Sequence, residues 1–440
     1  MRTVGIGIVG LGTVGGGTAR VLLGHRQQYL DSYGIDVKIV KASSLEPEDS
    51  ERLGLDEGVW CADWHDVVTD PDVDIVIEVI GGEHPATEIY ETAFAGGKHV
   101  VTANKALLGR KVETFAREAA EAGVQLRCEA AAAGGIPIVS TLEHDFIGNE
   151  ILTIAGIMNG TTNYILSRMA DEGLDFDEVL AAAQAAGYAE ANPTADIDGF
   201  DAASKIALLA SIGFRTRVTT DDVYMQGIRN ISAADIEQAS SLGYVIKLLA
   251  IARNTDSGVD VRVHPTMIPA DHQLAAVSGA MNAVYVVGDA IGETMFYGAG
   301  AGSFPTASAI VGDVLALADP ISRGEAPLPE NEPFERTLPV RSIEDLQTRY
   351  YLRLSVEDKV GALAPVVDVF AQAGISISSV RQLAQDADGA CPVVFLTHTA
   401  RESAVNAAEQ QLAALDVVRE VASVIRIEDI DAWTQGMFAN

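Results

Sequence analysis

The sequence predicts an α/β protein: an N-terminal Rossmann-type domain with a doubly wound parallel sheet, an α+β domain, and a C-terminal ferredoxin-like βαββαβ domain. Three observations predict this order. Strand-like and helix-like segments alternate at the start of the chain, a glycine-rich turn follows the first of these strands, and the end of the chain has the pattern of two βαβ halves. A length of 440 residues fits about three domains of roughly 150 residues. The expected bounds are 1–148, 149–320, a linker at 321–347, and 348–430.

The N-terminal domain begins with an apolar run at residues 3–9, followed by a glycine-rich turn and a helix-like segment at 18–30. Ile75, Val76 and Ile77 form the continuous apolar stretch that is typical of a strand covered on both faces. Helix-like segments at 93–97 and 112–123 each end in glycine before the next strand. Later strands are expected at 37–40, 74–79, 99–102 and 124–129. The alternation predicts a parallel sheet with right-handed crossovers.

The middle of the chain changes pattern from about Asn149, where longer helical segments mix with strand-like runs. We expect helices at 176–186, 202–212 and 233–253, and strands at 259–267 and 283–287. This mixture indicates an α+β domain built on its own sheet. The segment 322–340 carries Pro327, Pro329, Pro333 and Pro339, with Glu and Arg between them, and reads as a linker.

The C-terminal domain is predicted from six short segments. Strands are expected at 350–356, 375–380, 392–398 and 421–427, and helices at 363–373 and 403–414. The order strand, helix, strand, strand, helix, strand predicts a ferredoxin-like fold.

The composition excludes several classes of partner. Sixty-two acidic residues against thirty Lys and Arg give a formal charge of −32, and this field repels nucleic acid and anionic membrane surfaces. No apolar run approaches the ~18 residues of a membrane span, and the N-terminus shows no signal-peptide pattern. The three cysteines Cys61, Cys128 and Cys391 are far apart and lack metal-ligand spacing. We expect a cytoplasmic protein with neither a nucleic-acid nor a membrane partner.

The turn at residues 10–15, Gly-Leu-Gly-Thr-Val-Gly, is a G-x-G-x-x-G motif placed directly after a strand and before a helix. Gly10 permits the tight turn, Gly12 lets the backbone approach a pyrophosphate, and Gly15 lets the helix pack closely on the strand. The helix N-terminus offers N–H groups and positive dipole to the phosphates. This context favours a dinucleotide site over a merely flexible glycine turn.

The end of the second strand bears on the choice of nicotinamide cofactor. An acidic residue there would select NAD and an arginine NADP, whereas this chain has Lys41, Ser43 and Ser44. Lys41 can supply charge and the serines can donate to a phosphate, which favours NADP and leaves NAD possible. An ordinary exposed lysine at position 41 is the alternative.

Several ordered motifs resemble the homoserine dehydrogenase family. They are TANKA at 102–106, EAAAAGGIP at 129–137, GIMNGTTNY at 156–164, GYAE at 187–190, DIDG at 196–199, LGYVIKLLA at 242–250 and GAGAG at 298–302. The resemblance covers about residues 1–320. It implies NAD(P)-dependent interconversion of L-aspartate 4-semialdehyde and L-homoserine in threonine, methionine and isoleucine biosynthesis.

Two other functions compete with this interpretation. A non-catalytic sensor of NADP and an amino acid is one, and an intact Lys205 with Glu190 and Asp201 argues against it. The other is a different amino-acid or semialdehyde dehydrogenase. A phosphorylating aldehyde dehydrogenase would need a nucleophilic cysteine, and Cys128 lies inside a predicted strand where a thiolate is poorly exposed.

The substrate of such an enzyme carries an ammonium, a carboxylate and an aldehyde. Glu190 and Asp201 suit the ammonium, and Asp201 and Lys205 stand four apart on one face of a predicted helix. A surface ion pair is the alternative for that spacing. As hydride reaches the aldehyde carbon, charge grows on its oxygen, and a lysine can neutralise it and donate a proton.

The resemblance assigns roles to individual residues. Lys205 would be the proton donor, and Lys105 would orient and polarise the carbonyl. The substrate would contact Glu190, Asp196, Asp201, Gly187 and Tyr188. The cofactor would contact Gly10, Gly12, Thr13, Val14, Gly15, Lys41, Ser43, Gly81, Thr102, Lys105, Gly187 and Gly302.

The resemblance also implies a monovalent cation, Na⁺, in the loop after the last N-terminal strand. A carboxylate and backbone carbonyls suit such an ion. Carried over by position, the ligands are Glu129, Ala132, Gly134 and Ile136. A glycine-rich turn that only connects domains is the alternative.

The C-terminal βαββαβ segment, with DKVGAL at 358–363 and GISI at 374–377, resembles an ACT domain. The resemblance implies a regulatory amino acid, L-threonine, bound by the turn Asp358, Val360, Gly361 and Ala362. Val360 stands where the family often has proline, a departure that concerns the ligand-binding turn and not the fold. A dimerisation module without ligand is the alternative. The expected assembly is a homodimer or homotetramer.

Overall fold

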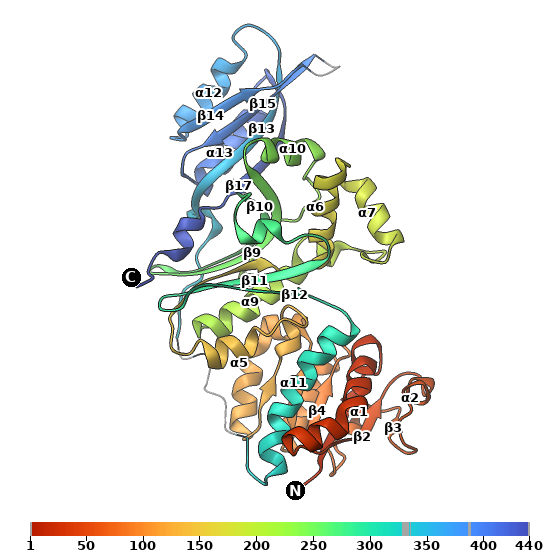
Figure 1. Cartoon of the computed structure of the whole chain (residues 1–440). Coiled ribbons are helices and arrows are strands. Elements are labelled where there is room, and N and C mark those ends of the chain that lie inside the picture. Colours follow the sequence, from red (N-terminus) through yellow and green to blue (C-terminus); the bar gives the residue numbers. More distant parts are fainter. Residues whose placement is uncertain (1, 328–333, 335, 386–388, 439–440) are drawn as a thin grey trace.

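The computed structural model describes residues 2–327, 334, 336–385 and 389–438 (Figure 1). Two sheets organise the described residues, one at each side of a layer of helices. Pro329 and Pro333 of the expected linker lie outside the described residues. Pro339, also in the expected linker, accepts the N–H of Val259 with its carbonyl, so this part of the linker pairs with the middle sheet.

The N-terminal sheet is parallel and six-stranded, in the order β3-β2-β1-β4-β5-β6, which confirms the Rossmann-type prediction. Every residue of the two central strands β1 and β4 is buried, as expected of a sheet covered on both faces. Its strands are β1 (Val4–Val9), β2 (Val37–Ser43), β3 (Trp60–Cys61), β4 (Ile75–Glu78), β5 (His99–Thr102) and β6 (Leu126–Arg127). Its helices are α1 (Thr13–Tyr33), α2 (Glu48–Leu53), α3 (Trp64–Val68), α4 (Ala86–Ala95) and α5 (Lys105–Glu121).

Helix α11 (Ser303–Ser322) returns from the middle of the chain to the N-terminal domain and lies beside α1 (Figure 1). Its apolar residues, from Ile310 to Ile321, share one core with β1, β2 and β4. The sequence places most of this helix in the middle domain, whereas in space it completes the Rossmann domain. Among the described residues it is the one helix long and apolar enough to cross a membrane. Its packing is that of a core helix.

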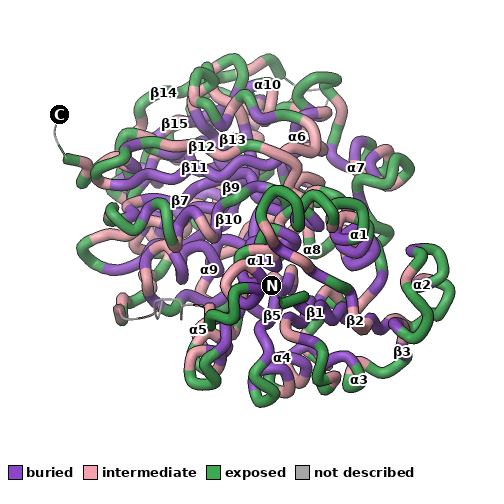
Figure 2. The backbone as a smooth tube through the Cα atoms, turned by 60° about the horizontal axis from the view of Figure 1, so that its bottom comes forward, coloured by how far each residue is buried: buried purple, intermediate pink, exposed green. Residues whose placement is uncertain are grey.

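The middle domain confirms an α+β arrangement with its own sheet. Its strands are β7 (Ile151–Ile157), β8 (Tyr224–Met225), β9 (Tyr244–Thr255), β10 (Gly258–Pro269), β11 (Met281–Gly288) and β12 (Gly292–Ala299). Its helices are α6 (Gly160–Glu172), α7 (Phe176–Ala185), α8 (Thr194–Ile197), α9 (Phe200–Phe214) and α10 (Ala233–Ser241). Figure 2 shows β7, β9, β10 and β11 as buried strands.

The helix predicted at 233–253 is wrong in its second half. Helix α10 ends at Ser241, Gly243 takes a positive φ of 83°, and the chain then enters strand β9. The run from Ile246 to Ala252 is buried on both faces of the strand. A continuous apolar run has no period that distinguishes a buried strand from a buried helix.

The C-terminal domain has the strand order β17-β13-β15-β14, with every neighbour antiparallel, which is the ferredoxin-like order. Both of its helices contribute to one core with β13 and β15. Its elements are β13 (Gln347–Glu357), α12 (Leu363–Gln372), β14 (Ile377–Gln382), β15 (Ala390–Thr397), β16 (Ala400–Arg401), α13 (Glu402–Ala413) and β17 (Val418–Ile427). Short 3₁₀ or π segments occur at Glu129–Ala131, Thr141–Asp145, Thr220–Asp222, Gln273–Ala276, Ile343–Asp345 and Ile430–Thr434.

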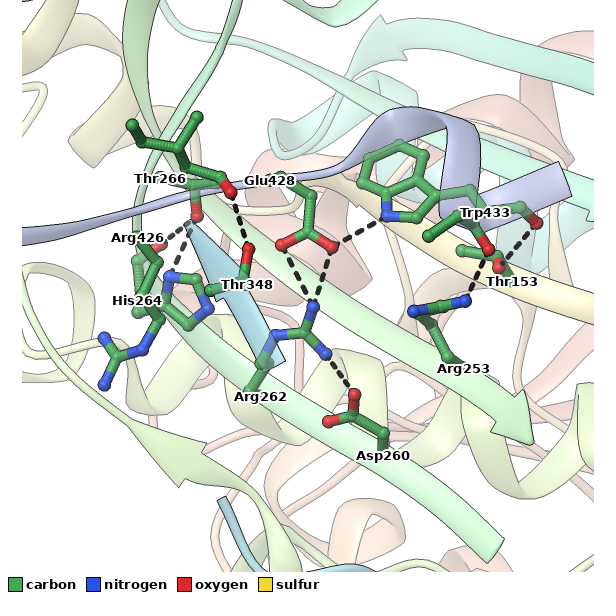
Figure 3. Close-up of polar contacts among 12 residues, drawn as sticks. Thr153, Arg253, Asp260, Arg262, His264, Thr266, Thr348, Arg426, Glu428 and Trp433 are labelled. Carbon is green, nitrogen blue, oxygen red and sulfur yellow. Dashed lines mark hydrogen bonds and ion pairs between the residues drawn. The ribbon is translucent and has the colours of Figure 1, made fainter. Parts of the chain in front are cut away.

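The middle and C-terminal sheets are continuous, because β10 pairs with β17 to form one sheet of eleven strands. Buried ion pairs reinforce this junction (Figure 3). The guanidinium of Arg262 lies 2.6 Å from Asp260 and 2.8 Å from Glu428, and Trp433 donates its indole N–H to Glu428 at 2.9 Å. The C-terminal domain is therefore fixed to the middle sheet by both backbone and charge.

Candidate active site

The glycine-rich turn has the geometry that its motif predicts. Gly10 has a φ of 103°, and a Cβ on Gly15 would lie 1.8 Å from the Gly10 carbonyl oxygen, so larger residues are excluded at both positions. A Cβ on Gly12 would meet no atom within 4 Å. Gly12 therefore leaves open space at the start of α1, beside Thr13 and Val14. The helix terminus can receive a phosphate there.

A buried carboxylate supports the next loop. Glu78, at the end of β4, accepts the N–H groups of Ile80 and Gly81 at 2.8 and 3.1 Å. It also accepts the hydroxyls of Tyr90 and Thr102 at 2.7 and 2.9 Å. This network fixes Gly81 and Thr102 at the carboxyl edge of the sheet, where open α/β sheets bind ligands. Glu78 and Tyr90 were not among the residues that the sequence singled out.

The residues expected to select the cofactor lie at the end of β2. Ser43 is buried, and its carbonyl accepts the N–H of Gly10 at 2.9 Å. Lys41 donates to the carbonyl of Gly58 at 3.1 Å. Ser43 thus holds the glycine-rich turn through its backbone, whereas Lys41 is partly exposed near the adenosine side of the crevice expected for this fold.

Three charged side chains from two helices converge at one carboxylate. Lys105, at the start of α5, places its Nζ 2.9 Å from Asp201 Oδ1. Lys205, one turn after Asp201 on α9, places its Nζ 2.7 Å from Asp201 Oδ2. Lys205 also donates to the carbonyl of Met158 at 2.7 Å. The one-face spacing of Asp201 and Lys205 is confirmed. Their side chains are only 9% and 7% exposed, so the pair is not a surface ion pair.

The surroundings drive the pKa values of the two lysines in opposite directions. Burial lowers the pKa of Lys205, and Asp201 offsets this only in part. The charge of Asp201 raises the pKa of Lys105, whose side chain is 45% exposed. Burial favours the neutral form of Asp201, but the two ammonium groups outweigh it and hold the pKa of Asp201 below its ordinary value. These opposite shifts in pKa suit Lys205 to acid–base chemistry and keep Lys105 charged.

Asn159 connects two acidic residues of this site by hydrogen bonds. Its amide donates to Asp196 at 2.7 Å and to Asp201 at 2.9 Å. The sequence did not identify Asn159 as a site residue. Its position before a helical segment could have indicated an N-cap, but not the bridge between two carboxylates.

The loop at 187–192 carries three of the residues expected to contact the substrate. Gly187, Tyr188 and Glu190 are all exposed. The ring of Tyr188 stacks on Tyr164 with centroids 4.3 Å apart, and Thr161 donates to the carbonyl of Tyr188 at 2.9 Å. Glu190 lies near enough to Lys105 to raise its pKa, as does Asp196. The loop therefore belongs to the same site as the lysine pair.

The expected cation loop lies beside the loop that carries Gly302. A Cβ on Gly134 would lie 2.4 Å from the Gly300 carbonyl oxygen, so the two loops are in close contact. The carboxylate of Glu129 accepts the N–H groups of Ile138, Val139 and Ser140 at 2.6, 2.9 and 2.8 Å. Both of its oxygens are engaged at the start of the following helical segment. In the described part of the chain, no group of three or more His, Cys, Asp or Glu side chains is arranged so that it could hold a metal ion.

The expected regulatory turn lies in the C-terminal domain, at the opposite end of the molecule from the N-terminal domain (Figure 1). Asp358 and Gly361 are exposed, Val360 is fully exposed, and Ala362 is buried at the start of α12. Gly361 has a positive φ of 84°.

A parallel sheet with a pyrophosphate-type turn, in a chain that also pairs Lys105 and Lys205 with one carboxylate, is the arrangement expected of a nicotinamide-dependent oxidoreductase. Comparison with known proteins agrees. Residues 137–315 match the family described as homoserine dehydrogenase, and residues 10–129 match its NAD-binding domain. The chain belongs to the homoserine dehydrogenase family.

Individual relatives support this assignment over nearly the whole chain. A homoserine dehydrogenase of Synechocystis is 45% identical over 437 residues, covering 97% of this chain and 99% of the relative. That of Bacillus subtilis is 40% identical, covering 99% and 100%. The crystal structure of a homoserine dehydrogenase from Thiobacillus denitrificans is 42% identical, with a TM-score of 0.91 and coverage of 98% and 99%. A hyperthermophilic archaeal homoserine dehydrogenase in complex with NADPH is 25% identical, with a TM-score of 0.62 and coverage of 71% and 97%.

Proposed function

We propose that this chain interconverts L-homoserine and L-aspartate 4-semialdehyde in threonine, methionine and isoleucine biosynthesis, with Lys205 as the acid–base group. The observation that carries the proposal is the shared carboxylate of Asp201, which holds two lysines whose pKa values are shifted in opposite directions. A nicotinamide bound at this site would supply the hydride chemistry, in which the carbinol carbon of homoserine loses hydride on oxidation and the aldehyde carbon gains it on reduction. The chain must move the accompanying proton.

Lys205 is suited to that proton transfer. Two of its N–H groups are directed to Asp201 and Met158, so one remains for the substrate oxygen. In homoserine oxidation the neutral amine accepts the hydroxyl proton, and in reduction the ammonium returns it to the oxygen. Lys105 keeps its charge beside Asp201 and polarises the same oxygen.

The substrate ammonium is best held by Glu190 and Asp196. Asp201, which the sequence also suggested for this role, already accepts bonds from both lysines and from Asn159. Of roughly four acceptor directions on a carboxylate, one is left on Asp201. Gly187 and Tyr188 would complete the wall around the substrate.

For the cofactor we propose NADP, with the pyrophosphate at Gly10, Gly12, Thr13, Val14 and Gly15. Lys41 would supply a cation for the 2′-phosphate, and the NADPH bound by the archaeal relative agrees with this preference. The remainder of the cofactor site would be lined by Gly81, Thr102, Lys105, Gly187 and Gly302. NAD remains the alternative that the assay below distinguishes.

A bound Na⁺ at the 129–136 loop is a further part of the proposal. Because the carboxylate of Glu129 is engaged with three backbone N–H groups, the ion would depend on carbonyl oxygens, including those of Ala132, Gly134 and Ile136. Ala133 and Gly134 both have positive φ, so the loop reverses tightly. Such an ion would brace this loop against Gly300 and Gly302.

We also propose that the C-terminal domain is an ACT domain that binds L-threonine at Asp358, Val360, Gly361 and Ala362 in a homodimer or homotetramer. Truncation is a poor test, because removing β17 and the segment after it would leave Arg262 without Glu428. The test is an L-threonine inhibition curve for the full chain and for Asp358→Ala, each normalised to its own uninhibited rate. A weaker response in the variant supports the turn as the sensor, and an unchanged curve excludes it.

A cytoplasmic location is proposed on two grounds. The three cysteines are all buried and lie far apart in the sequence, which suits a reducing compartment, and biosynthetic NADP chemistry belongs to the same compartment. Fluorescence of a tagged chain in fractionated cells would test the location.

The central experiment is spectrophotometric oxidation of L-homoserine with NADP and with NAD. Lys205→Ala should lose roughly 10²-fold or more in kcat, as expected for loss of a general base. Lys38→Ala, on the exposed face of β2, is the matched control and should keep the parent rate. Absence of homoserine oxidation by the parent chain with either cofactor would exclude the proposed function and favour a sensor.

A further inference from the structure

Asn159 follows strand β7 and is the N-cap residue of helix α6. Asn159 is only 4% exposed, so its side-chain amide has little access to water. The side-chain oxygen Oδ1 accepts the N–H of Thr162 at 2.9 Å and its hydroxyl at 3.0 Å. Because this oxygen must face the helix N–H groups, the amide nitrogen is directed to the opposite side.

On that side the amide nitrogen bridges two acidic residues from different helices. Nδ2 lies 2.7 Å from Oδ1 of Asp196 on α8 and 2.9 Å from Oδ2 of Asp201 on α9. An amide has two N–H groups, and both are used. The bridge therefore fixes the separation of the two carboxylates.

The residue before Asn159 takes part in the same arrangement. The carbonyl of Met158 accepts one N–H of Lys205, and the Asp201 oxygen that Asn159 contacts accepts another. Two successive residues thus position both the lysine and its counter-ion. Little rotation of the Lys205 ammonium is possible unless one of these contacts breaks.

Helix α6 is itself anchored one turn further on. Asn163 donates to the carbonyls of Val277 and Met281 at 3.3 and 3.1 Å. Lys247, buried on β9, donates to Asn163 at 3.1 Å and to the Val277 carbonyl at 2.6 Å. The cap residue is therefore attached to a helix that cannot slide along the sheet.

We propose that Asn159 is a positioning residue for proton transfer: its amide holds Asp196 and Asp201 in register so that Lys205 presents its free N–H direction to the substrate oxygen. This inference rests on the proposed homoserine chemistry. The amide stabilises the negative charge of Asp201, so that Asp201 raises the pKa of Lys205 less than it would without the amide. Lys105, Asp196 and Glu190 are the other charged groups that face this cluster.

The competing explanation is that Asn159 only caps α6. Asn159→Ser and Asn159→Asp separate the two roles, because Ser, Asp and Asn are about equally good N-caps while neither replacement keeps an NH₂ group. Asn159→Thr is a third capping residue without an amide, should either variant fail to fold. Asp63→Ala removes the cap of α3, far along the chain from this site, and controls for loss of a cap alone.

The measurements are kcat/KM for L-homoserine, its pH profile, and NADPH affinity by fluorescence titration. We expect kcat/KM to fall roughly tenfold to hundredfold in the Ser and Asp variants, with NADPH affinity at the parent value. The acid limb of the profile should move to higher pH, further for Asp than for Ser, because Lys205 then holds its proton more tightly. Asp63→Ala should change neither quantity.

Parent-like kcat/KM and pH profiles in both capping variants would overturn the positioning role while leaving the homoserine chemistry in place. An inactive parent chain would instead remove the proposed function, and the inference with it.

Discussion

Lys105 and Lys205 bind opposite oxygens of one carboxylate, that of Asp201, at 2.9 and 2.7 Å. The first lysine comes from the Rossmann domain and the second from the middle domain, so a single buried carboxylate joins the two halves of the site. Because the two ammonium groups repel each other and both need Asp201, a change at Asp201 should affect each lysine differently.

Asp201→Asn tests this coupling through the pH profile. Loss of the negative charge lowers the pKa of Lys205 further, since Asp201 is what opposes the effect of burial. Lys205 then stays neutral to lower pH, and the acid limb of homoserine oxidation should shift to lower pH even as kcat/KM falls. This direction is opposite to that expected for Asn159→Ser.

Asp201→Glu keeps the charge and serves as the control for the shift. An acid limb at the parent position in Asp201→Asn would mean that Lys205 is not the group that titrates.

The junction between the sheets should be intolerant of an unpaired charge. Arg262→Met leaves Asp260 and Glu428 buried without their shared cation, and breaking a buried pair in this way costs about 3–5 kcal/mol of unfolding free energy. Arg323→Ala, in an exposed pair with Asp319, should cost less than about 1 kcal/mol. Urea unfolding followed by tryptophan fluorescence measures both, and equal losses in the two variants would contradict a structural role for the buried cluster.

Lys247 should make stability depend on pH. Burial lowers the pKa of Lys247 to about 8 in the folded chain, whereas an unfolded lysine has a pKa of about 10.4. Between these values the unfolded state binds more protons, so the unfolding free energy should rise as pH increases from 8 to 10. Lys247→Met should flatten this rise, and denaturant unfolding at several pH values compares the two slopes. A slope that is the same in both proteins would assign the effect to other groups.

Sequence patterns predicted correctly those features that depend on residues close together in the chain. The glycine-rich turn, the spacing of Asp201 and Lys205, and the βαββαβ order each follow from neighbouring residues, and the structure has all three. Residues 244–253 were misassigned because an apolar run buried on both faces carries no period, and only Gly243 marks the break.

Contacts between distant segments were beyond the sequence patterns. Asn159 reads as a helix cap, yet its amide bridges residues on two later helices. Glu78 reads as part of an apolar strand, yet it holds four donors beneath the cofactor loop. Helix α11 is assigned to the domain that precedes it in the chain, although its apolar face fits the N-terminal sheet. In each case the partner is set by tertiary packing.

The excess of negative charge should make the folded chain sensitive to salt. With a formal charge of −32, the folded state suffers self-repulsion that the expanded unfolded chain relieves. Added KCl shortens the screening length from ~10 Å at 0.1 M to ~3 Å at 1 M, so the thermal unfolding midpoint should rise over this range and then level off. Differential scanning calorimetry at fixed pH, with and without KCl, measures the change. A midpoint that does not respond below 1 M would contradict a destabilising charge repulsion. A midpoint that keeps rising in proportion to concentration above 1 M would assign that rise to exclusion of the salt from the protein surface.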